Sequence, residues 1–362
     1  MGKPRLALSL LLIGPALLLG QEARFGFSDP ATISFFGAQT RRATVDGSSG
    51  RSVTPAFRAN LYPTLKLGSH WFAYGAVQVH SEPYFYEELS SRAHDVAANV
   101  LQAYVGYSRI ANGRAVTIKA GQLSSAFGSF PLRYDDARNW LIDLPQSYGY
   151  YYTPVTVYGM PGVEVDVAFG RVDARVQLTN SSPSNPRSLL QADQYANWTA
   201  GGGVTLRPGF RLGVSAQRGP YLHRQHRFYL PGEAAPKSLP AVGYGTDVQW
   251  GRGRVSVNGE AQRFQYAYRA IPYFFTTIAY GEAKVTLTPR WYLAGRAGAR
   301  WRTAYMGRDE SYEAVLAFRP AAGHLLKFGY LAAHGPLSPG TRDNVIGVQY
   351  VMSLNPPAVA WQ

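Results

Sequence analysis

The chain has 362 residues and no cysteine, which excludes disulfides, cysteine-ligated metals and lipid attachment through a cysteine. Lysine and arginine number 36 against 22 aspartates and glutamates, a formal net charge of +14. The basic residues are scattered singly, which argues against nucleic-acid binding. Beyond the N-terminus no apolar run approaches the roughly 20 residues of a transmembrane helix, which excludes a helical membrane protein.

The first segment of the chain has the layout of a secretory signal. Lys3 and Arg5 precede an apolar stretch from Leu6 to Leu19. We therefore expect residues 1–20 to be a signal peptide, with cleavage after Gly20, or after Ala23 as the alternative. The remaining residues, 21–362, are expected to form a single domain in the bacterial outer membrane.

Side chains alternate between apolar and polar from residue 31 to residue 352, which is the period of a β-strand. Val163, Val165 and Val167, for example, alternate with Glu164 and Asp166. The apolar face carries no charge at its centre, as lipid requires, because a charge at mid-bilayer costs roughly 2–4 kcal/mol. The expected strands are 31–40, 55–67, 71–80, 97–110, 114–124, 161–169, 172–180, 199–206, 210–218, 242–250, 254–267, 275–287, 290–302, 311–318, 324–334 and 343–353.

The connections between these strands alternate between short and long. Short ones carry turn residues such as Asn112-Gly113 and Gly170-Arg171, and the longest connection, 125–160, follows the fifth strand. Short turns on one side and long loops on the other are the plan of an outer-membrane barrel. We predict an all-β fold, a transmembrane antiparallel β-barrel of about 16 strands that must close because lipid leaves no partner for an open edge.

At sixteen strands a barrel leaves a water-filled channel. By the alternation, the predicted pore-lining residues number ten basic and seven acidic, an excess that favours mild anion preference. Simple wall residues in cross-strand pairs are the other interpretation. The basic ones are Arg58, Lys66, Lys119, Arg175, Arg211, Lys284, Arg296, Arg300, Arg302 and Lys327, and the acidic ones are Glu164, Asp166, Asp173, Asp247, Glu260, Glu282 and Glu313.

Two long connections are candidates for function. The loop 125–160 is rich in aromatic and paired charged residues, and could fold into the lumen as a constriction, cap the barrel or contact a neighbouring subunit. Its candidate constriction residues are Arg133, Asp135, Asp136, Arg138 and Tyr150. The loop 219–241, with His223, Arg224, His226, Arg227 and Lys237, could attract anionic solutes or bind lipopolysaccharide phosphates. No cofactor or metal site is expected.

The final segment, NVIGVQYVMS, places Gly347, Tyr350 and Met352 at the spacing of the barrel-assembly signal of the Gram-negative outer-membrane porin superfamily, which the chain resembles. The segment Lys119 to Phe130, KAGQLSSAFGSF, is similar to the strand-to-loop segment of phosphate-selective (O/P-type) porins. The resemblance implies a passive channel for small hydrophilic solutes and ions, a homotrimer, and the barrel-assembly machinery as a partner.

Three other interpretations of the sequence remain open. An outer-membrane barrel enzyme would need a nucleophile or an acid pair beside a positioned histidine, and only His80 and His334 fall near the outer rim of strands. A scaffold barrel could surround a periplasmic partner. A soluble secreted β protein is the third, and membrane fractionation would separate it from the others.

Overall fold

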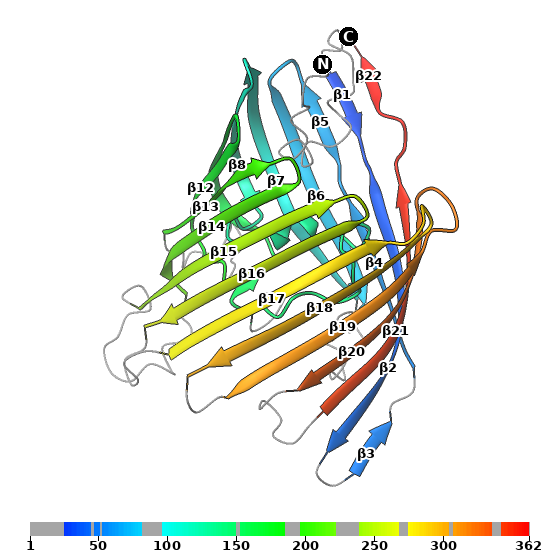
Figure 1. Ribbon diagram of the computed structural model, residues 1–362. Coiled ribbons are helices and arrows are strands. Elements are labelled where there is room, and N and C mark those ends of the chain that lie inside the picture. Colours follow the sequence, from blue (N-terminus) through cyan, green and yellow to red (C-terminus); the bar gives the residue numbers. More distant parts are fainter. Residues whose placement is uncertain are drawn as a thin grey trace.

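A computed structural model describes residues 25–44, 47–50, 53–81, 96–149, 153–184, 196–221, 239–267, 274–303, 307–334 and 342–361. Over these ranges the chain forms an antiparallel sheet of sixteen strands that closes into a barrel (Figure 1). No helix in the described ranges is long and apolar enough to cross a membrane.

The predicted sixteen strands are confirmed, with small shifts at their ends. Three of them are written in two pieces because the ladder is interrupted. In chain order they are β1 (Phe25–Ser28) with β2 (Ala31–Thr44), β4 (Thr54–Leu61) with β5 (Thr64–Leu67), β6 (Trp71–Ser81), β7 (Val96–Ala111), β8 (Arg114–Leu123), β11 (Met160–Phe169), β12 (Val172–Thr179), β13 (Asn197–Arg207), β14 (Phe210–Pro220), β15 (Pro240–Arg252), β16 (Val255–Tyr266), β17 (Phe274–Thr286), β18 (Trp291–Arg302), β19 (Arg308–Phe318), β20 (His324–His334) and β21 (Arg342–Leu354) with β22 (Val359–Trp361).

The barrel closes between its first and last strands. β2 pairs antiparallel with β21, with Phe35 opposite Tyr350, and β1 pairs with β22. On its other side β2 pairs with β4, so the first strand has a partner along both edges. Closure of this kind satisfies the backbone donors and acceptors that lipid cannot pair.

Short turns gather at one end of the barrel. The turn between β7 and β8 consists of Asn112 and Gly113, both with positive φ (50° and 74°), which asparagine and glycine tolerate best. β1 and β22 reach the same end of the barrel (Figure 1).

The connection 41–54, between the first two predicted strands, is not a loop throughout. β2 continues to Thr44, and β3 (Gly47–Gly50) turns back and pairs with it, so this connection begins as a β-hairpin. The hydrogen bonds of the hairpin pair backbone N–H and C=O groups beyond the apolar part of β2. Side chains there do not alternate between apolar and polar, so the sequence does not indicate a strand. Large parts of the other long connections, including 222–238 and its basic residues, lie outside the described ranges, as do residues 1–24 and Tyr150.

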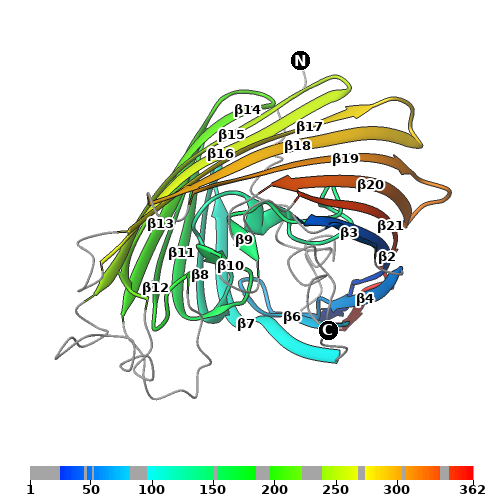
Figure 2. The ribbon, with the colours of Figure 1, turned by 90° about the horizontal axis from the view of Figure 1, so that it is seen from below.

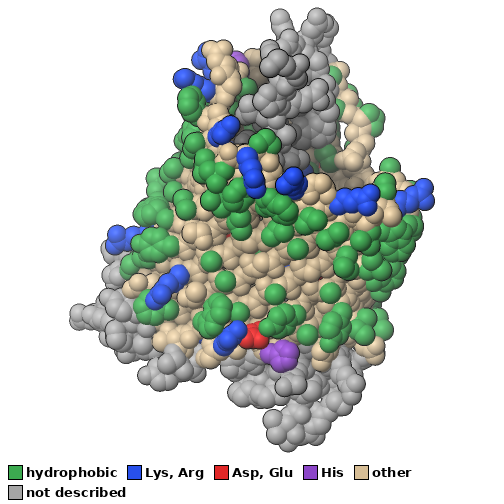
Figure 3. Space-filling view, viewed as in Figure 1, with side chains coloured by type: hydrophobic (Ala, Val, Ile, Leu, Met, Phe, Trp, Pro, Cys, Tyr) green, Lys and Arg blue, Asp and Glu red, His purple; other side chains and the backbone are tan. Residues whose placement is uncertain are grey.

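The two faces of the wall differ as the alternation predicts. Val165 and Val176, from β11 and β12, are 41% and 55% exposed. Glu164, which precedes Val165 in β11 and faces the lumen, is 4% exposed. On the side shown in Figure 3, hydrophobic side chains are spread over the outer surface of the strands, and most charged side chains lie towards its edges. The buried polar side chains lie on the other face, where they meet the segment that enters the barrel.

Candidate functional site: the lumen and the segment inside it

The described parts of the segment between β8 and β11, residues 124–149 and 153–159, lie inside the ring of strands (Figure 2). It contains a 3-10 helix, Phe130–Arg133, and two short strands, β9 (Tyr148–Gly149) and β10 (Val155–Thr156), which pair in parallel. We call it the inner segment. Its charged and backbone groups bond to inward-facing residues of eight wall strands, β2, β4, β12, β16, β17, β18, β19 and β20, which fixes it in the lumen.

The first anchor joins the inner segment to β4 and β20. Arg58 forms an ion pair with Asp136, and both side chains are at most 1% exposed. Lys327 Nζ donates to the backbone oxygens of Asp136, Asn139 and Leu141 at 2.8, 3.0 and 2.8 Å. Burial opposes ionisation of Asp136, but Arg58 and then Lys327 hold the pKa of this carboxyl below its usual value of 3.8.

Asp135 forms the next contact on the same side of the lumen. It accepts a hydrogen bond from the hydroxyl of Tyr62, and others from Asn60 Nδ2 at 3.3 Å and Thr32 Oγ1 at 3.2 Å. These donors come from β2, from β4 and from the residue that follows β4. Two consecutive aspartates therefore attach one turn of the inner segment to the first two wall strands.

The second anchor is a buried carboxylate on β16. Glu260 accepts from the backbone N–H of Phe130 at 2.9 Å, from Ser129 Oγ at 2.8 Å and from the hydroxyl of Tyr280 at 2.7 Å. The hydroxyl of Tyr148 donates to the other carboxylate oxygen of Glu260. Burial, and then the charge of Glu260, raise the pKa of Tyr148 well above its usual range, so this phenol remains a donor.

The third anchor uses two glutamates and one arginine of the wall. Glu282 pairs with Arg133 of the inner segment and with Arg296 of β18. Glu313 accepts from the backbone N–H of Ile142 at 2.8 Å and of Asp143 at 3.1 Å. These two carboxylates therefore hold the inner segment and also compensate the positive charge of Arg296.

Apolar contacts between the inner segment and the wall accompany these polar anchors. Leu141 and Ile142 belong to one buried cluster, with wall residues that include Phe36 and Val315. Phe127 and Phe130 belong to a second, which includes Phe264 and Tyr280. The sequence carries a signal for this packing, because Phe36, Phe264 and Val315 are apolar residues on an otherwise polar face.

The predicted pore-lining residues all lie on this inner face, and each is buried or half-buried. Lys119 pairs with both Glu164 and Asp166, and Arg211 pairs with Asp173 and Asp247. Cross-strand pairing, the alternative interpretation of these charges, therefore accounts for both clusters.

The three arginines of β18 do not form an open positive stripe. Arg300 Nη2 lies 2.7 Å from Asp309, and Arg302 pairs with the same carboxylate. Arg296 pairs with Glu282 and Glu313. The count of ten against seven omitted Asp309 because the predicted strand began at residue 311, whereas β19 begins at Arg308.

A few cations of the lumen form no salt bridge with a carboxylate among the described residues, although one of them, Arg175, lies opposite Asp166 in the sheet. Lys66 and Lys284 are half-buried, and Lys284 Nζ lies 4.8 Å from the ring centroid of Trp140. Arg175 donates to the backbone oxygen of Gly128 at 3.4 Å. Arg138, on the inner segment, is exposed. These four are the candidates for charges that a solute meets.

The structure places Gln177 in the site, although sequence reasoning did not. It is fully buried, accepts from the backbone N–H of Ala126 at 2.9 Å and donates to the backbone oxygen of Ser124 at 2.6 Å. A lone glutamine on a polar face gives no signal that it fixes the start of a loop. Among the described residues no group of three or more metal-ligating side chains occurs.

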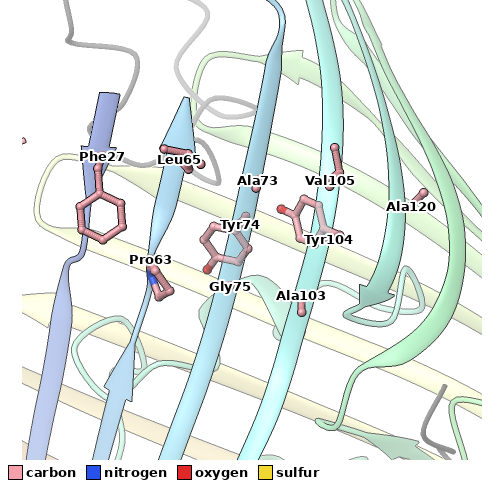
Figure 4. A pocket seen from close by; sticks show the side chains of 10 residues that line it. All are labelled: Phe27, Pro63, Leu65, Ala73, Tyr74, Gly75, Ala103, Tyr104, Val105 and Ala120. Carbon is pink, nitrogen blue, oxygen red and sulfur yellow. The ribbon is translucent and has the colours of Figure 1, made fainter. Parts of the chain in front are cut away.

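An apolar groove of about 440 Å³ lies across β1, β5, β6, β7 and β8 (Figure 4). Phe27, Leu65, Ala73 and Val105 line it in one cross-strand row, and Phe27 and Val105 are 40% and 48% exposed. This row shares the outward face of the wall, whereas Tyr74 and Tyr104, which also line the groove, alternate with it and belong to the inward face.

No protein-family model and no curated protein matches the sequence. Solved structures do match the fold. The outer membrane channel DcaP of Acinetobacter baumannii has a TM-score of 0.59 at 11% identity, covering 91% of this chain and 97% of that one. The chain has the porin fold. An anion-selective porin from Comamonas acidovorans has a TM-score of 0.59 at 10% identity, covering 91% of this chain and 100% of that one. OmpF of Salmonella typhi in complex with daunomycin has a TM-score of 0.60 at 10% identity, covering 89% of this chain and 97% of that one.

Proposed function

We propose that this protein is a porin of the bacterial outer membrane, a water-filled channel through which small hydrophilic solutes and ions diffuse passively. The observation that carries the proposal is the lumen, which is lined by charged side chains and narrowed by a segment that buried ion pairs hold in place. An apolar outer face around a charged interior suits a barrel in lipid, and the porin fold supports the same function.

The inner segment is proposed to be the constriction. It is bound through Asp135, Asp136, Arg133 and its backbone, so these groups position it, whereas Arg138 is exposed and free to meet solutes. Lys66, Lys284 and Arg175 add positive charge without a bonded carboxylate. A weak anion preference follows mainly from these residues. On β18, Arg296 is balanced by Glu282 and Glu313, and Arg300 and Arg302 share Asp309, so only one positive charge is left there.

The decisive experiment is single-channel recording of the purified barrel in planar bilayers under a potassium chloride gradient. We expect stepwise, ohmic conductance and a reversal potential of the sign of anion preference. Arg138→Gln with Lys66→Gln should move this potential towards zero, whereas Arg308→Gln, which removes an arginine paired with Glu310, should not. Absence of conductance from folded barrels would overturn the channel function, and cation preference would overturn the charge assignment.

The remaining assignments are also proposals. Residues 1–20 are proposed to direct export, which the mass of the mature N-terminus would test. A homotrimer is proposed because a structural neighbour, OmpT of Vibrio cholerae, was solved in a trimer form (TM-score 0.52, 10% identity, covering 89% of this chain and 99% of that one). Native mass measurement of the unboiled protein would test it. Lipopolysaccharide and the barrel-assembly machinery are the proposed cellular partners, and no catalytic role is assigned.

A further inference from the structure

Four exposed arginines border the outer face of the barrel at its short-turn end. We call them the arginine belt. Its members are Arg109, Arg114, Arg207 and Arg252. On the side shown in Figure 3, blue Lys and Arg side chains lie along the upper edge of the apolar face, with no red Asp or Glu side chain beside them there. None of the four forms an ion pair with a carboxylate among the described residues.

The register of the strands directs these side chains outward. Arg109 lies opposite Val116, which is 40% exposed. The guanidinium of Arg114 lies 4.6 Å from the ring centroid of Phe169, itself 56% exposed. Cross-strand partners share a face, so the belt faces what surrounds the barrel and not the lumen.

Hydrogen bonds between neighbouring turns hold the backbone that carries the belt in a fixed arc. The backbone N–H of Thr205 donates to Arg171 O at 2.7 Å, and Arg171 Nη1 donates to Leu206 O at 3.2 Å. Arg254 Nη1 donates to Leu287 O at 3.3 Å. The first two bonds fix the chain just before Arg207, and none of the three uses a guanidinium N–H group of the four belt arginines.

We propose that the arginine belt binds the phosphate groups of anionic phospholipids in the membrane leaflet at the short-turn end. A guanidinium donates two parallel hydrogen bonds to a phosphate, and its apolar stem lies along lipid while the charge reaches the headgroup. Basic residues near an anionic leaflet are attracted to it, and here no carboxylate offsets them.

Position distinguishes a lipid from a soluble anion as the ligand. The belt is continuous with exposed apolar side chains such as Phe169, Leu206 and Leu287, which suit the acyl chains below a headgroup. Solutes in the lumen do not reach it. The inference goes beyond the proposed channel function, but it rests on the proposed placement of the barrel in a membrane.

The test uses the folded full-length barrel in phosphatidylcholine bilayers that contain spin-labelled phosphatidylglycerol or spin-labelled phosphatidylcholine. The quantity measured is the excess of phosphatidylglycerol among the lipids immobilised on the protein. We expect an excess in the unmodified protein that falls by about one half in R114Q/R252Q and is almost lost in R109Q/R114Q/R207Q/R252Q, in proportion to the arginines removed. Added inorganic phosphate at matched ionic strength should leave the excess unchanged, because the acyl chains contribute to binding.

K66Q/R138Q is the charge-matched control, because it removes two cations that face the lumen. It should keep the full excess. An unchanged excess in the quadruple variant, or an equal loss in the control, would overturn the proposal, and loss of the excess to inorganic phosphate would assign the belt to soluble anions. Conductance of every variant is recorded in parallel, so a barrel that conducts but shows no lipid preference refutes only this inference.

Discussion

Asp136 is a carboxylate that is fully buried yet charged, which is costly unless a partner compensates. Arg58 and Lys327 supply that compensation, and the net result is a pKa below the usual value. Such a pair adds little stability over apolar packing, but removing one partner leaves the other uncompensated. The pair therefore specifies where the inner segment lies, and its loss should release that segment.

Arg58→Ala should free the turn of the inner segment that contains Asp136. Removing one member of a buried pair costs about 3–5 kcal/mol, so we expect the segment to detach while the wall stays closed. The measurement is single-channel conductance, which should rise and become noisier. Arg308→Ala is the control, because it removes an arginine whose side chain is 55% exposed and whose pair lies outside the lumen. Equal conductance in both variants would show that Arg58 does not hold the segment.

Acid should produce the same release without a mutation. The pKa of Asp136 is lower in the folded state than its usual 3.8, so its stabilising contribution is complete above pH 3.8 and is lost as the pH falls further. We expect proteolysis of the inner segment by an acid-stable protease to accelerate only below this value. Asp136→Asn lacks the titrating group, so its cleavage rate should depend less on pH. A transition centred near neutrality would point to a different group.

At the scale of the element, the wall strands could be predicted and the inner segment could not. Alternation over β11 or β18 is a local property, because each outward valine or tryptophan responds to lipid alone. The contacts of the inner segment join residues far apart in sequence, such as Phe130 with Glu260 and Ile142 with Glu313. The length and composition of this segment are visible in the sequence. Its anchors are not, because they depend on which strands lie around it in the closed barrel.

Val165→Arg should impair insertion of the barrel, because Val165 is 41% exposed on the outer face near the middle of β11. The expected cost is roughly 2–4 kcal/mol. Thr117→Arg is the matched control, because Thr117 lies opposite Asp166 on the inner face at the same depth. The folded fraction is measured by the band shift between unboiled and boiled samples. Equal damage from the two changes would reverse the assignment of the faces.

At the scale of the whole molecule, closure is the property on which the others depend. Sixteen strands with paired edges enclose a space wide enough to hold the inner segment, and an open sheet would leave β2 and β21 each with an unpaired edge. Sequence implied closure through the membrane argument, although no local pattern shows which strands meet. The register between the first and last strands is information that only the structure contains.

Closure can be tested by a cross-link, because the chain has no cysteine to interfere. Phe35 and Tyr350 are directly opposite on β2 and β21, so F35C/Y350C should form a disulfide on mild oxidation of the folded barrel. F35C/L316C is the control, because Leu316 lies on β19, with β20 and β21 between it and β2. We expect oxidised F35C/Y350C to migrate as a more compact species after boiling without reductant, since its ends remain joined, and the control to migrate as the unmodified chain. Efficient cross-linking of the control, or none in the paired variant, would contradict the register.

With the ends joined, the barrel should also unfold at a higher temperature, because the bond restricts the unfolded chain over a loop of more than 300 residues.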